Sequence, residues 1–446
     1  MSTDTHDLKY RLADRPPVAV TLLSSLQWVG FVIACNAMVP LVVGDAFGFS
    51  APQVAALTQR VFLVIALVSL LQVVRGHGWP ISEGVSYVWL GVFVALAGVE
   101  RAAGHDPLLI LPKLEGGLIA AGAVLAGLSL LGLSGALQRL FTPVVVATYL
   151  ILLPIQFSGP FLRSMTGASL AGSHGLVDLR VTAVSLAAII ATLGSSLFGR
   201  GAWRSLSSLL GFAVGLFAWR LAGLPLGAGA AAKGTGTTGW LLVWGPPQWD
   251  AGFIITSVLT SFLLLSNVFA SLISTEQAIV EPPPDGIARR ATLVNGLGTI
   301  LTGLTSSIGL IPVASSAGFI RLTGVAARLP FTLSCVILAA MAFWPPAAHL
   351  IALLPLPLAY AVTFAAFNEM FSLGVLRLRQ SALTRGNLAA LSLSVFIGCG
   401  LMFLPPAALS GMPPVLRNLL GNGLLTGALL SLLLEHLVFR GLPTPA

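Results

Sequence analysis

Polar residues interrupt two otherwise apolar stretches of this chain, and their types suit the binding of a small polar molecule. The first stretch, PISEGVSYVW, runs from Pro80 to Trp89, and the second, LIPVASSAGFIRLTG, runs from Leu310 to Gly324. Irregular backbone at membrane depth is tolerated only where protein buries it or where it lines a watery cavity. A half-helix that starts after such a break directs free N–H groups and partial positive charge into that cavity. We therefore expect the two stretches to be the two halves of one site.

Glu83, three residues after Pro80, is the most informative side chain in these stretches. A carboxylate at membrane depth costs about 2.5–3.5 kcal/mol on insertion scales and indicates function by default. Glu83 is therefore the candidate for carrying a coupled proton. Two structural alternatives remain open: Glu83 lies at the cytoplasmic interface, or it forms a salt bridge with Arg60.

The composition places the chain in a membrane. Of its 446 residues, 56% are hydrophobic and 9% are charged, and the mean hydropathy is +0.94, whereas a soluble domain carries about 25% charged residues. Cationic loops, which orient membrane proteins, account for the net charge of +8 without any nucleic-acid partner. No His, Asp or Glu cluster has the spacing of a metal site, and no nucleophile motif is present. We expect neither an enzyme, nor a metal, nor a cofactor.

At roughly 20 apolar residues per span, the sequence predicts an all-α polytopic protein with about fourteen transmembrane segments. The expected segments are Val18–Val43, Pro52–Val74, Pro80–Val99, Leu114–Leu133, Thr142–Leu162, Val181–Leu197, Ser205–Leu221, Ala251–Thr275, Ile287–Ser307, Leu310–Thr323, Leu329–Phe343, His349–Leu373, Leu388–Phe403 and Met412–Phe439.

Basic residues predict the orientation of these segments. Most of them fall at one set of segment ends, including Lys9, Arg75, Arg289 and Arg377. Because basic loops stay in the cytoplasm, both termini are expected there, with an even number of spans.

Fourteen segments divide into seven and seven, and an odd number per half inverts the second half relative to the first. The third segment of each half is then the counterpart of the other. These are Pro80–Val99 and Leu310–Thr323, the two short, polar segments. Interrupted segments at corresponding positions are a pointer to a transporter site.

Four passages make the chain resemble the nucleobase–ascorbate transporter family, also called nucleobase–cation symporter family two, which includes uracil and xanthine permeases. They are RPP leading into SLQWVGFVIACNAMVPLVVG (Arg15–Gly44), PISEGVSYVW (Pro80–Trp89), RRATLVNGLGTILTGL (Arg289–Leu304) and the stretch from Leu310 to Gly324. In the last of these, Gly318, Thr323 and Gly324 match the family signature. The likeness covers nearly the whole chain in order.

The resemblance implies two inverted repeats of seven segments, with short antiparallel strands in segments three and ten. It implies a core domain at 18–133 and 251–343 and a gate domain at 142–221 and 349–439. A tail at 1–17 and a loop at 222–250 complete the chain. A homodimer through the gate domains and a location in the inner (plasma) membrane are further expectations.

The chain departs from the family at three positions that matter for function. Ser266 and Ser315 stand where many members have carboxylates in segments eight and ten, and Trp28 replaces the usual histidine. The segment-eight carboxylate is a favoured proton-coupling group, so proton symport does not transfer directly. The search for a coupling carboxylate therefore moves to Glu83.

The resemblance also suggests which residues contact the substrate. Tyr87 would pack its aromatic face on a base, since every base has a π-face, and Ser86, Ala314 and Ser315 would offer backbone groups. An asparagine gives both a donor and an acceptor, which suits Asn267 for a lactam edge. The full set is Gln27, Ser86, Tyr87, Ser266, Asn267, Ala314, Ser315 and Ser316.

Each of these residues also has a structural reading: a packed strand for Ser86 and Tyr87, interhelical hydrogen bonds for Ser266 and Asn267, and bracing of the core for Gln27. Arg60 and Glu369 are further buried candidates. Arg60 is expected to pair structurally, and Glu369, in FNEMF, to lie near the cytoplasmic end of segment twelve. Arg321 is expected to be cytoplasmic.

The leading hypothesis is secondary active import of a nucleobase, a purine or pyrimidine such as xanthine or uracil, with protons. The alternative is a sulfate-permease-like anion transporter of the same fold, because two half-helix N-termini without an acid between them favour an anion. We expect no long regulatory domain after Phe439, unlike in most of that anion family.

Overall fold

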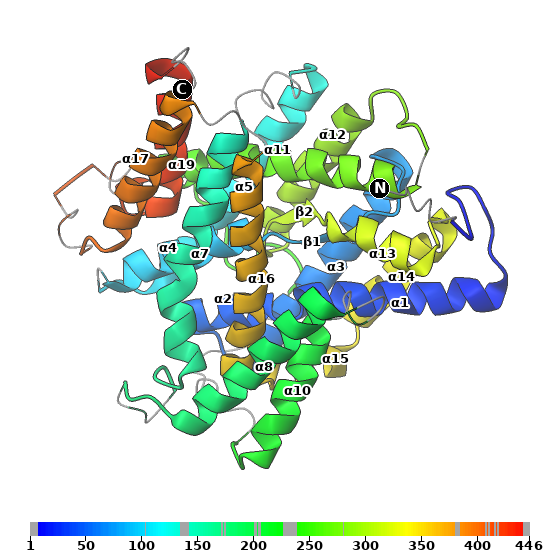
Figure 1. The fold of residues 1–446 in the computed structure, drawn as a ribbon, viewed down its shortest axis with the longest axis horizontal. Coiled ribbons are helices and arrows are strands. Elements are labelled where there is room, and N and C mark those ends of the chain that lie inside the picture. The colour runs from blue at the N-terminus through cyan, green and yellow to red at the C-terminus, as the bar shows by residue number, and fades with distance from the viewer. Residues whose placement is uncertain are drawn as a thin grey trace.

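The computed structural model confirms a helical membrane protein built around a small pair of strands (Figure 1). It describes residues 8–102, 104–133, 142–170, 173, 175–199, 203, 207–225, 239–279, 281–379, 384–405, 408, 411–413, 416 and 419–439.

The helices of the first half are α1 (Val18–Asn36), α2 (Val39–Phe47), α3 (Ala51–Arg75), α4 (Tyr87–Ala102), η1 (Pro107–Ile110), α5 (Leu111–Leu130), α7 (Pro143–Met165), α8 (Leu179–Phe198) and α10 (Ser207–Leu221). Those of the second half are α11 (Ala251–Ile279), α12 (Ile287–Leu304), α13 (Ser315–Thr323), α14 (Arg328–Ala342), α15 (Pro345–Ala352), α16 (Leu356–Leu378), α17 (Arg385–Met402), α19 (Gly423–Leu433) and η3 (Leu434–Val438). The strands are β1 (Glu83–Val85) and β2 (Leu310–Pro312).

Within the described residues, eight helices are long and apolar enough to cross a bilayer, or nine if the bent pair α14 and α15 is one span. The other expected segments are shorter or less apolar helices, including the two that follow the strands. The expected segment His349–Leu373 is two helices, α15 and α16, rather than one. Pro355, which lies between the two helices, explains the division, because proline cannot donate the hydrogen bond that would continue a helix.

The two strands pair antiparallel at the point where the two halves of the chain meet. Glu83 lies opposite Pro312, Gly84 opposite Ile311 and Val85 opposite Leu310. Hydrogen bonds extend the ladder at both ends, because Val313 N–H donates to the Ser82 carbonyl at 2.9 Å and Ser86 N–H donates to the Gly309 carbonyl at 3.0 Å. Equivalent strands in inverted halves are expected to pair in this antiparallel way.

Side chains from three helices satisfy the outer edges of this strand pair. On β1, Asn36 Oδ1 accepts from Val85 N–H at 2.6 Å and Ser69 Oγ accepts from Glu83 N–H at 2.9 Å. On β2, Ser271 Oγ donates to the Pro312 carbonyl at 2.8 Å. A buried, unpaired backbone group costs about as much as a lost hydrogen bond. These three residues therefore allow two isolated strands to exist inside a helical protein.

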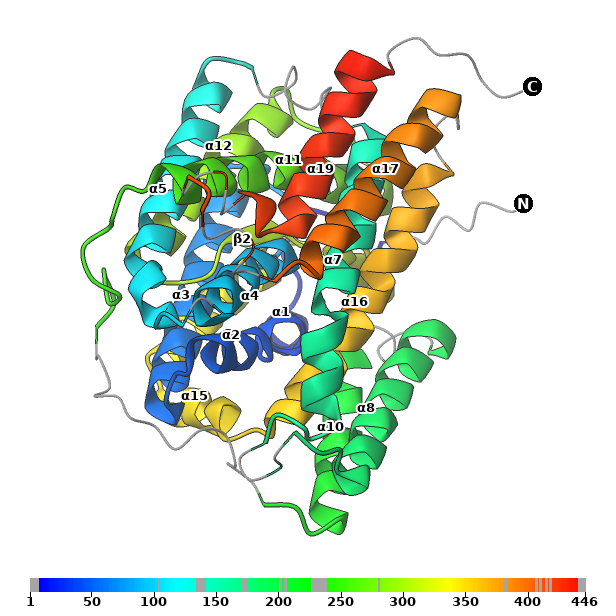
Figure 2. The same ribbon diagram turned by 90° about the vertical axis from the view of Figure 1, so that its left-hand side faces the viewer.

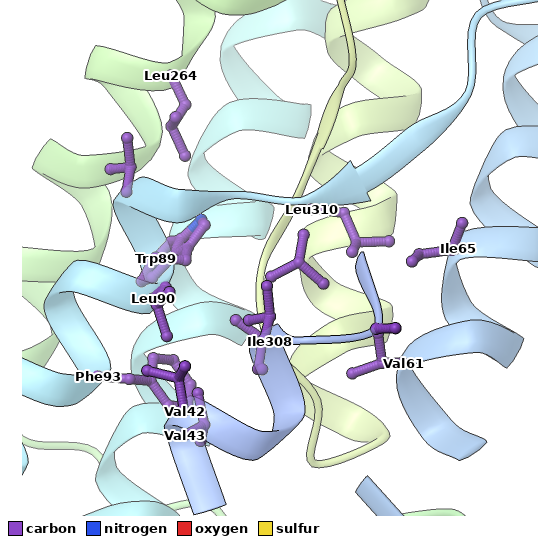
Figure 3. Close-up of a cluster of buried hydrophobic side chains, with 14 of the residues drawn as sticks. Val42, Val43, Val61, Ile65, Trp89, Leu90, Phe93, Leu264, Ile308 and Leu310 are labelled. Atoms are coloured by element: carbon purple, nitrogen blue, oxygen red, sulfur yellow. The ribbon is translucent and has the colours of Figure 1, made fainter. Parts of the chain in front are cut away.

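An apolar cluster surrounds the strands (Figure 3). It contains Val42 and Val43 of α2, Val61 and Ile65 of α3, and Trp89, Leu90 and Phe93 of α4, with Ile308 and Leu310 at the second strand. Apolar packing on several sides fixes where the two half-helices begin.

The helices pack in two sets (Figures 1 and 2). In one set, α5 packs on α11 and α12, and α3 packs on α12 and α14. In the other set, α7 packs on α16 and α19, α8 packs on α10, and α17 packs on α19. The strand pair is contacted by α1, α3, α11 and α12. The first set includes α1, which packs on α14, and α4, which packs on η1 before α5. The division into core and gate domains at the expected boundaries stays a prediction.

The first described residues are bound to the rest of the chain. Lys9 N–H donates to the Gly324 carbonyl at 2.9 Å, and Ala326 N–H donates to the Tyr10 carbonyl at 2.8 Å. The end of α13 and the residues that lead into α1 therefore lie side by side. Residues 1–7 of the expected tail lie outside the described residues.

Glycines bring α5 and α12 into backbone contact. A Cβ on Gly122 would lie 2.5 Å from the Gly296 carbonyl oxygen and 2.6 Å from the Ile300 nitrogen. Gly296 is the glycine of the NG pair in the sequence RRATLVNGLG. Small residues that let helix backbones approach closely are typical of membrane helix contacts.

We predict that Gly122→Ala destabilises the protein, by about 1–3 kcal/mol, because a methyl group cannot enter this contact without moving the α12 backbone. Gly127→Ala in the same helix is the matched control, since nothing lies within 4 Å of a Cβ at that position. The midpoint of thermal unfolding in detergent measures both variants. Equal midpoints for the two would show that α5 and α12 are not in backbone contact.

We also predict that Asn36→Ala costs about 1–3 kcal/mol of stability, because it leaves the buried N–H of Val85 without an acceptor. Asn368→Ala, at an exposed position of α16, is the control and should shift the midpoint little. An unchanged midpoint for Asn36→Ala would contradict the role of Asn36 at the strand edge.

Candidate functional site

The two half-helices α4 and α13 both direct their N-termini at the strand pair. Each begins within three residues of its strand: Tyr87 follows Val85 by two residues, and Ser315 follows Pro312 by three. Because the strands are antiparallel, the half-helices leave the ladder from opposite ends. The partial positive charges of two helix N-termini therefore converge on one region of the interior.

Ser86 fixes the start of α4. Its hydroxyl accepts from the N–H groups of Val88 at 3.2 Å and Trp89 at 3.4 Å, while its own N–H donates across the ladder to Gly309. This is the capping arrangement in which a serine oxygen satisfies free helix donors. The lone pairs of this buried hydroxyl are therefore used to position the half-helix.

Tyr87 lies between elements of both helix sets. Its hydroxyl donates to the Cys35 carbonyl of α1 at 3.3 Å, and its ring meets Phe367 of α16 edge-on, with 5.4 Å between ring centroids. The side chain is half-buried. Part of the ring is thus free to contact a molecule placed beside the strands.

The first residues of α13 are exposed, whereas the first N–H groups of α4 are bonded to Ser86. Ala314 and Ser315 are exposed, and so are Gly318 and Arg321 further along the same helix. Residues three or four apart share a helix face, so these positions form one accessible stripe. Ser316 is buried, and its hydroxyl accepts from Ser82 N–H at 3.1 Å. Ser315 is therefore accessible to a ligand, whereas Ser316 braces the ladder.

On α11, the two predicted residues Ser266 and Asn267 differ in their hydrogen bonding. Ser266 Oγ donates to the Leu263 carbonyl of its own helix at 2.8 Å. The Asn267 amide is half-buried and makes no hydrogen bond to the described part of the chain. Ser271, four residues later and therefore on the same face, bonds to Pro312 of β2. Asn267 thus presents a free amide on the helix face directed at the second strand.

Glu83 lies on the closed face of the strand pair. Side chains alternate between the faces of a strand, so Glu83 shares a face with Val85, Leu310 and Pro312, all of which are buried. Both carboxylate oxygens are buried and have no hydrogen-bond partner among the described residues. The half-buried Ile311 lies on the other face, which is therefore the more open of the two.

Arg60 and Glu83 form no ion pair within 4.0 Å, so the expected alternative of a salt bridge between them is not what the structure shows. Arg60 instead donates from Nε to the Ser306 carbonyl at 3.1 Å. The Ser306 hydroxyl bonds to the carboxylate of Glu115 and accepts from Val243 N–H at 2.7 Å. Arg60 therefore belongs to a buried polar cluster that ties α3 and α5 to the turn before β2.

The sequence interpretation did not include Glu115, which is fully buried near the start of α5. Its signal was present, because it is a carboxylate at the start of the fourth apolar segment. Among the described residues, no group of three or more His, Cys, Asp and Glu side chains is placed to hold a metal ion.

Trp28 is buried where the family usually has a histidine. Its ring lies 4.5 Å from Phe319 of α13 and 5.0 Å from Phe331 of α14, measured between centroids. Aromatic pairs at this spacing add stability beyond the area that they bury. Trp28 thus fastens the second half-helix to α1, while its neighbour Gln27 is exposed and makes no side-chain hydrogen bond to a described residue.

Glu369 was expected to be buried, but it is exposed and lies past the midpoint of α16. Its carboxylate accepts a hydrogen bond from the hydroxyl of Ser196 on α8. Carboxylates in spans that face lipid are costly, so exposure at this depth indicates contact with water or with a ligand.

Comparison with known proteins agrees with this architecture. The family model Xan_ur_permease, described as "Permease family", matches residues 19–407. YwdJ of Bacillus subtilis, whose name assigns it provisionally to purine transport, is 31% identical over 92% of this chain and 93% of its own length. The uric acid permease PucK of Bacillus subtilis is 24% identical over 94% and 95% of the two chains. The xanthine permease XanP of Escherichia coli is 22% identical over 98% and 96%.

Two solved structures share the fold. The transmembrane domain of the cyanobacterial bicarbonate transporter BicA aligns with a TM-score of 0.59 at 15% identity, over 93% of this chain and 96% of that domain. The murine anion transporter Slc26a9 aligns with a TM-score of 0.60 at 11% identity, over 95% of this chain and 69% of its own. At such identities the likeness concerns the fold alone, whereas the family match and the 31% identity span most of the sequence. The chain therefore belongs to the Xan_ur_permease family of membrane permeases, the nucleobase–ascorbate transporters that its motifs resemble.

Proposed function

We propose that the protein imports a purine base across the plasma membrane by secondary active transport, coupled to protons. The observation that carries this proposal is the convergence of two half-helix N-termini on one strand pair, with an aromatic ring and a free amide beside it. Names of relatives at 22–31% identity refer to purines, uric acid and xanthine, which favours an oxopurine over a pyrimidine.

The side chains at this position suit a flat, polar heterocycle. The ring of Tyr87 can pack on its face, because an aromatic ring stacks on any base. The Asn267 amide can donate and accept on one edge, and Ala314 and Ser315 can offer N–H groups to carbonyl oxygens at the other. Ser86, Ser266 and Ser316 would then hold these groups in place, and Gln27 would line the approach.

Access to the site differs between the two ends of the helix bundle. At one end, Tyr360 of α16 donates to Asp45 Oδ2 of α2 at 2.8 Å, which joins the two helix sets. Toward the other end, Ser315, Gly318 and Arg321 are exposed along α13. We assign the open end to the cytoplasm, together with both termini, and take movement of one helix set against the other as the alternating-access step.

Glu83 remains the candidate proton carrier. Its buried carboxyl has no counter-charge within 4.0 Å among the described residues, and burying a charge without a partner is costly. The side chain of Gln72 is a polar neighbour of this carboxyl. In this role Glu83 would act through the strand that it belongs to, since both of its carboxylate oxygens are buried. A homodimer through the gate domain also stays a proposal.

The anion-transport alternative shares the helix N-termini but not the sequence relationship. Its support is fold similarity at 11–15% identity. A free asparagine amide and an aromatic ring beside the strands fit a base better than sulfate or bicarbonate. We therefore retain one function.

We predict that purified protein in liposomes takes up at least one of xanthine, uric acid, hypoxanthine, guanine or uracil, and takes it up faster when the outside is acidic. Glu83→Gln should abolish the pH dependence while leaving binding in place. Bicarbonate and sulfate in excess should not compete. No uptake of any base, with or without a pH gradient, would refute the proposed function. Unchanged pH dependence in Glu83→Gln would remove Glu83 from the coupling step alone.

We predict that a cysteine in place of Ser315 reacts with a membrane-impermeant thiol reagent and that bound base protects it. Ser316→Cys is the matched control and should react at least about 10-fold more slowly, because Ser316 is fully buried. Cys35, Cys335 and Cys399 are first replaced by serine or alanine. Equal reaction at both positions, or labelling of position 315 that base does not slow, would place the substrate elsewhere.

A further inference from the structure

The site described above is built from one helix set and lacks a carboxylate on its open face. The serines at positions 266 and 315 offer no anionic acceptor, and Glu83 lies on the closed face. A nucleobase nevertheless carries ring N–H donors that need acceptors once they leave water, because an unpaired buried donor costs about 1–3 kcal/mol.

An exposed carboxylate on α16, in the other helix set, lies within electrostatic range of Tyr87. Phe367 of α16 meets the Tyr87 ring edge-on at 5.4 Å, so α16 contacts the start of α4 directly. Glu369 follows two residues later, and its carboxylate lies within electrostatic range of the Tyr87 hydroxyl and the Cys35 thiol. The two residues are themselves joined, because the Tyr87 hydroxyl donates to the Cys35 carbonyl.

The hydrogen bond from Ser196 leaves most of this carboxylate free. A carboxylate accepts about four hydrogen bonds, and Ser196 supplies one of them, to Oε1. The bond holds the side chain toward α8 within its own helix set, and the residue as a whole is exposed. Glu369 is thus held in position with unused acceptor capacity.

Resting on the proposed function, we infer that Glu369 is a substrate-binding residue that accepts a ring N–H of the purine base from the α16 side. The base then lies between Tyr87 and Asn267 on one helix set and Glu369 on the other. Because the two sets move against each other during transport, this contact would form only when they close on the base. Glu369 thereby supplies from α16 the carboxylate that segments eight and ten of this chain lack.

The test is a double-mutant cycle between the protein and the ligand. Tritiated xanthine binding to purified protein is competed by xanthine and by each of its mono-N-methyl derivatives, in the wild type and in Glu369→Gln. If Glu369 accepts one N–H, Glu369→Gln weakens the binding of xanthine by about 10-fold or more. The derivative methylated at that nitrogen should bind both proteins nearly equally, so that the two changes are strongly coupled.

Three variants separate recognition from structure. Glu435→Gln is the matched control, since the Glu435 carboxylate also accepts from a hydroxyl of another helix, Thr142. Glu435→Gln should leave the ratio of the affinities for xanthine and for each methylated derivative unchanged. Ser196→Ala removes the bond to α8 but keeps the carboxylate, and should preserve most of the ratio. Glu369→Asp withdraws the acceptor by one methylene. It should weaken the binding of xanthine but not that of the derivative methylated at the nitrogen in question. This variant provides a test even if Glu369→Gln does not fold.

Additive effects, in which Glu369→Gln or Glu369→Asp weakens xanthine and every derivative by the same factor, would overturn the inference and leave Glu369 as a bridge between α16 and α8. Wild-type binding with full discrimination in Glu369→Gln would also overturn it, while the proposed function would stand. Failure of the wild type to bind xanthine, uric acid or hypoxanthine would instead refute the proposed function itself.

Discussion

The structure depends on one constraint. An isolated pair of strands lies in the interior of a membrane protein, where water cannot bond to the backbone N–H and C=O groups at its outer edges. Three residue pairs make the ladder, and Asn36, Ser69 and Ser271 bond to its outer edges. Pro312 reduces the demand further, because proline has no N–H to satisfy. Once the strands are fixed, the starts of α4 and α13 are fixed as well. Because the strand edges are bonded in this way, the N-termini of both half-helices are directed at one region.

Around this frame, the chain replaces features of its family with packing. Trp28 stands where a histidine is usual and fastens α1 to α13 and α14. Serines stand where carboxylates are usual, and one of them, Ser266, bonds to its own helix. Two carboxylates, Glu83 and Glu115, are buried away from the open face. Glu369, the exposed acidic group within electrostatic range of Tyr87, comes from α16, which belongs to the other helix set.

Sequence reasoning located the broken segments, because proline, glycine and serine in an apolar context are unambiguous. It also predicted antiparallel strands, through the family resemblance. It could not tell which face of β1 Glu83 occupies, since a shift of one residue inverts every side chain of a strand. The bond between Glu369 and Ser196 was equally inaccessible, because it depends on how distant helices pack. The role of Asn36 was missed although an asparagine in an apolar segment is itself a signal.

The central claim is that a purine base binds between the starts of the two half-helices. A cryo-electron microscopy structure of the protein with xanthine or uric acid bound tests it most directly. The account predicts density for the base between Tyr87 and Ser315, within hydrogen-bond distance of Asn267, on the open face of the strand pair. Density on the Glu83 face, or at a surface away from the strands, would contradict it.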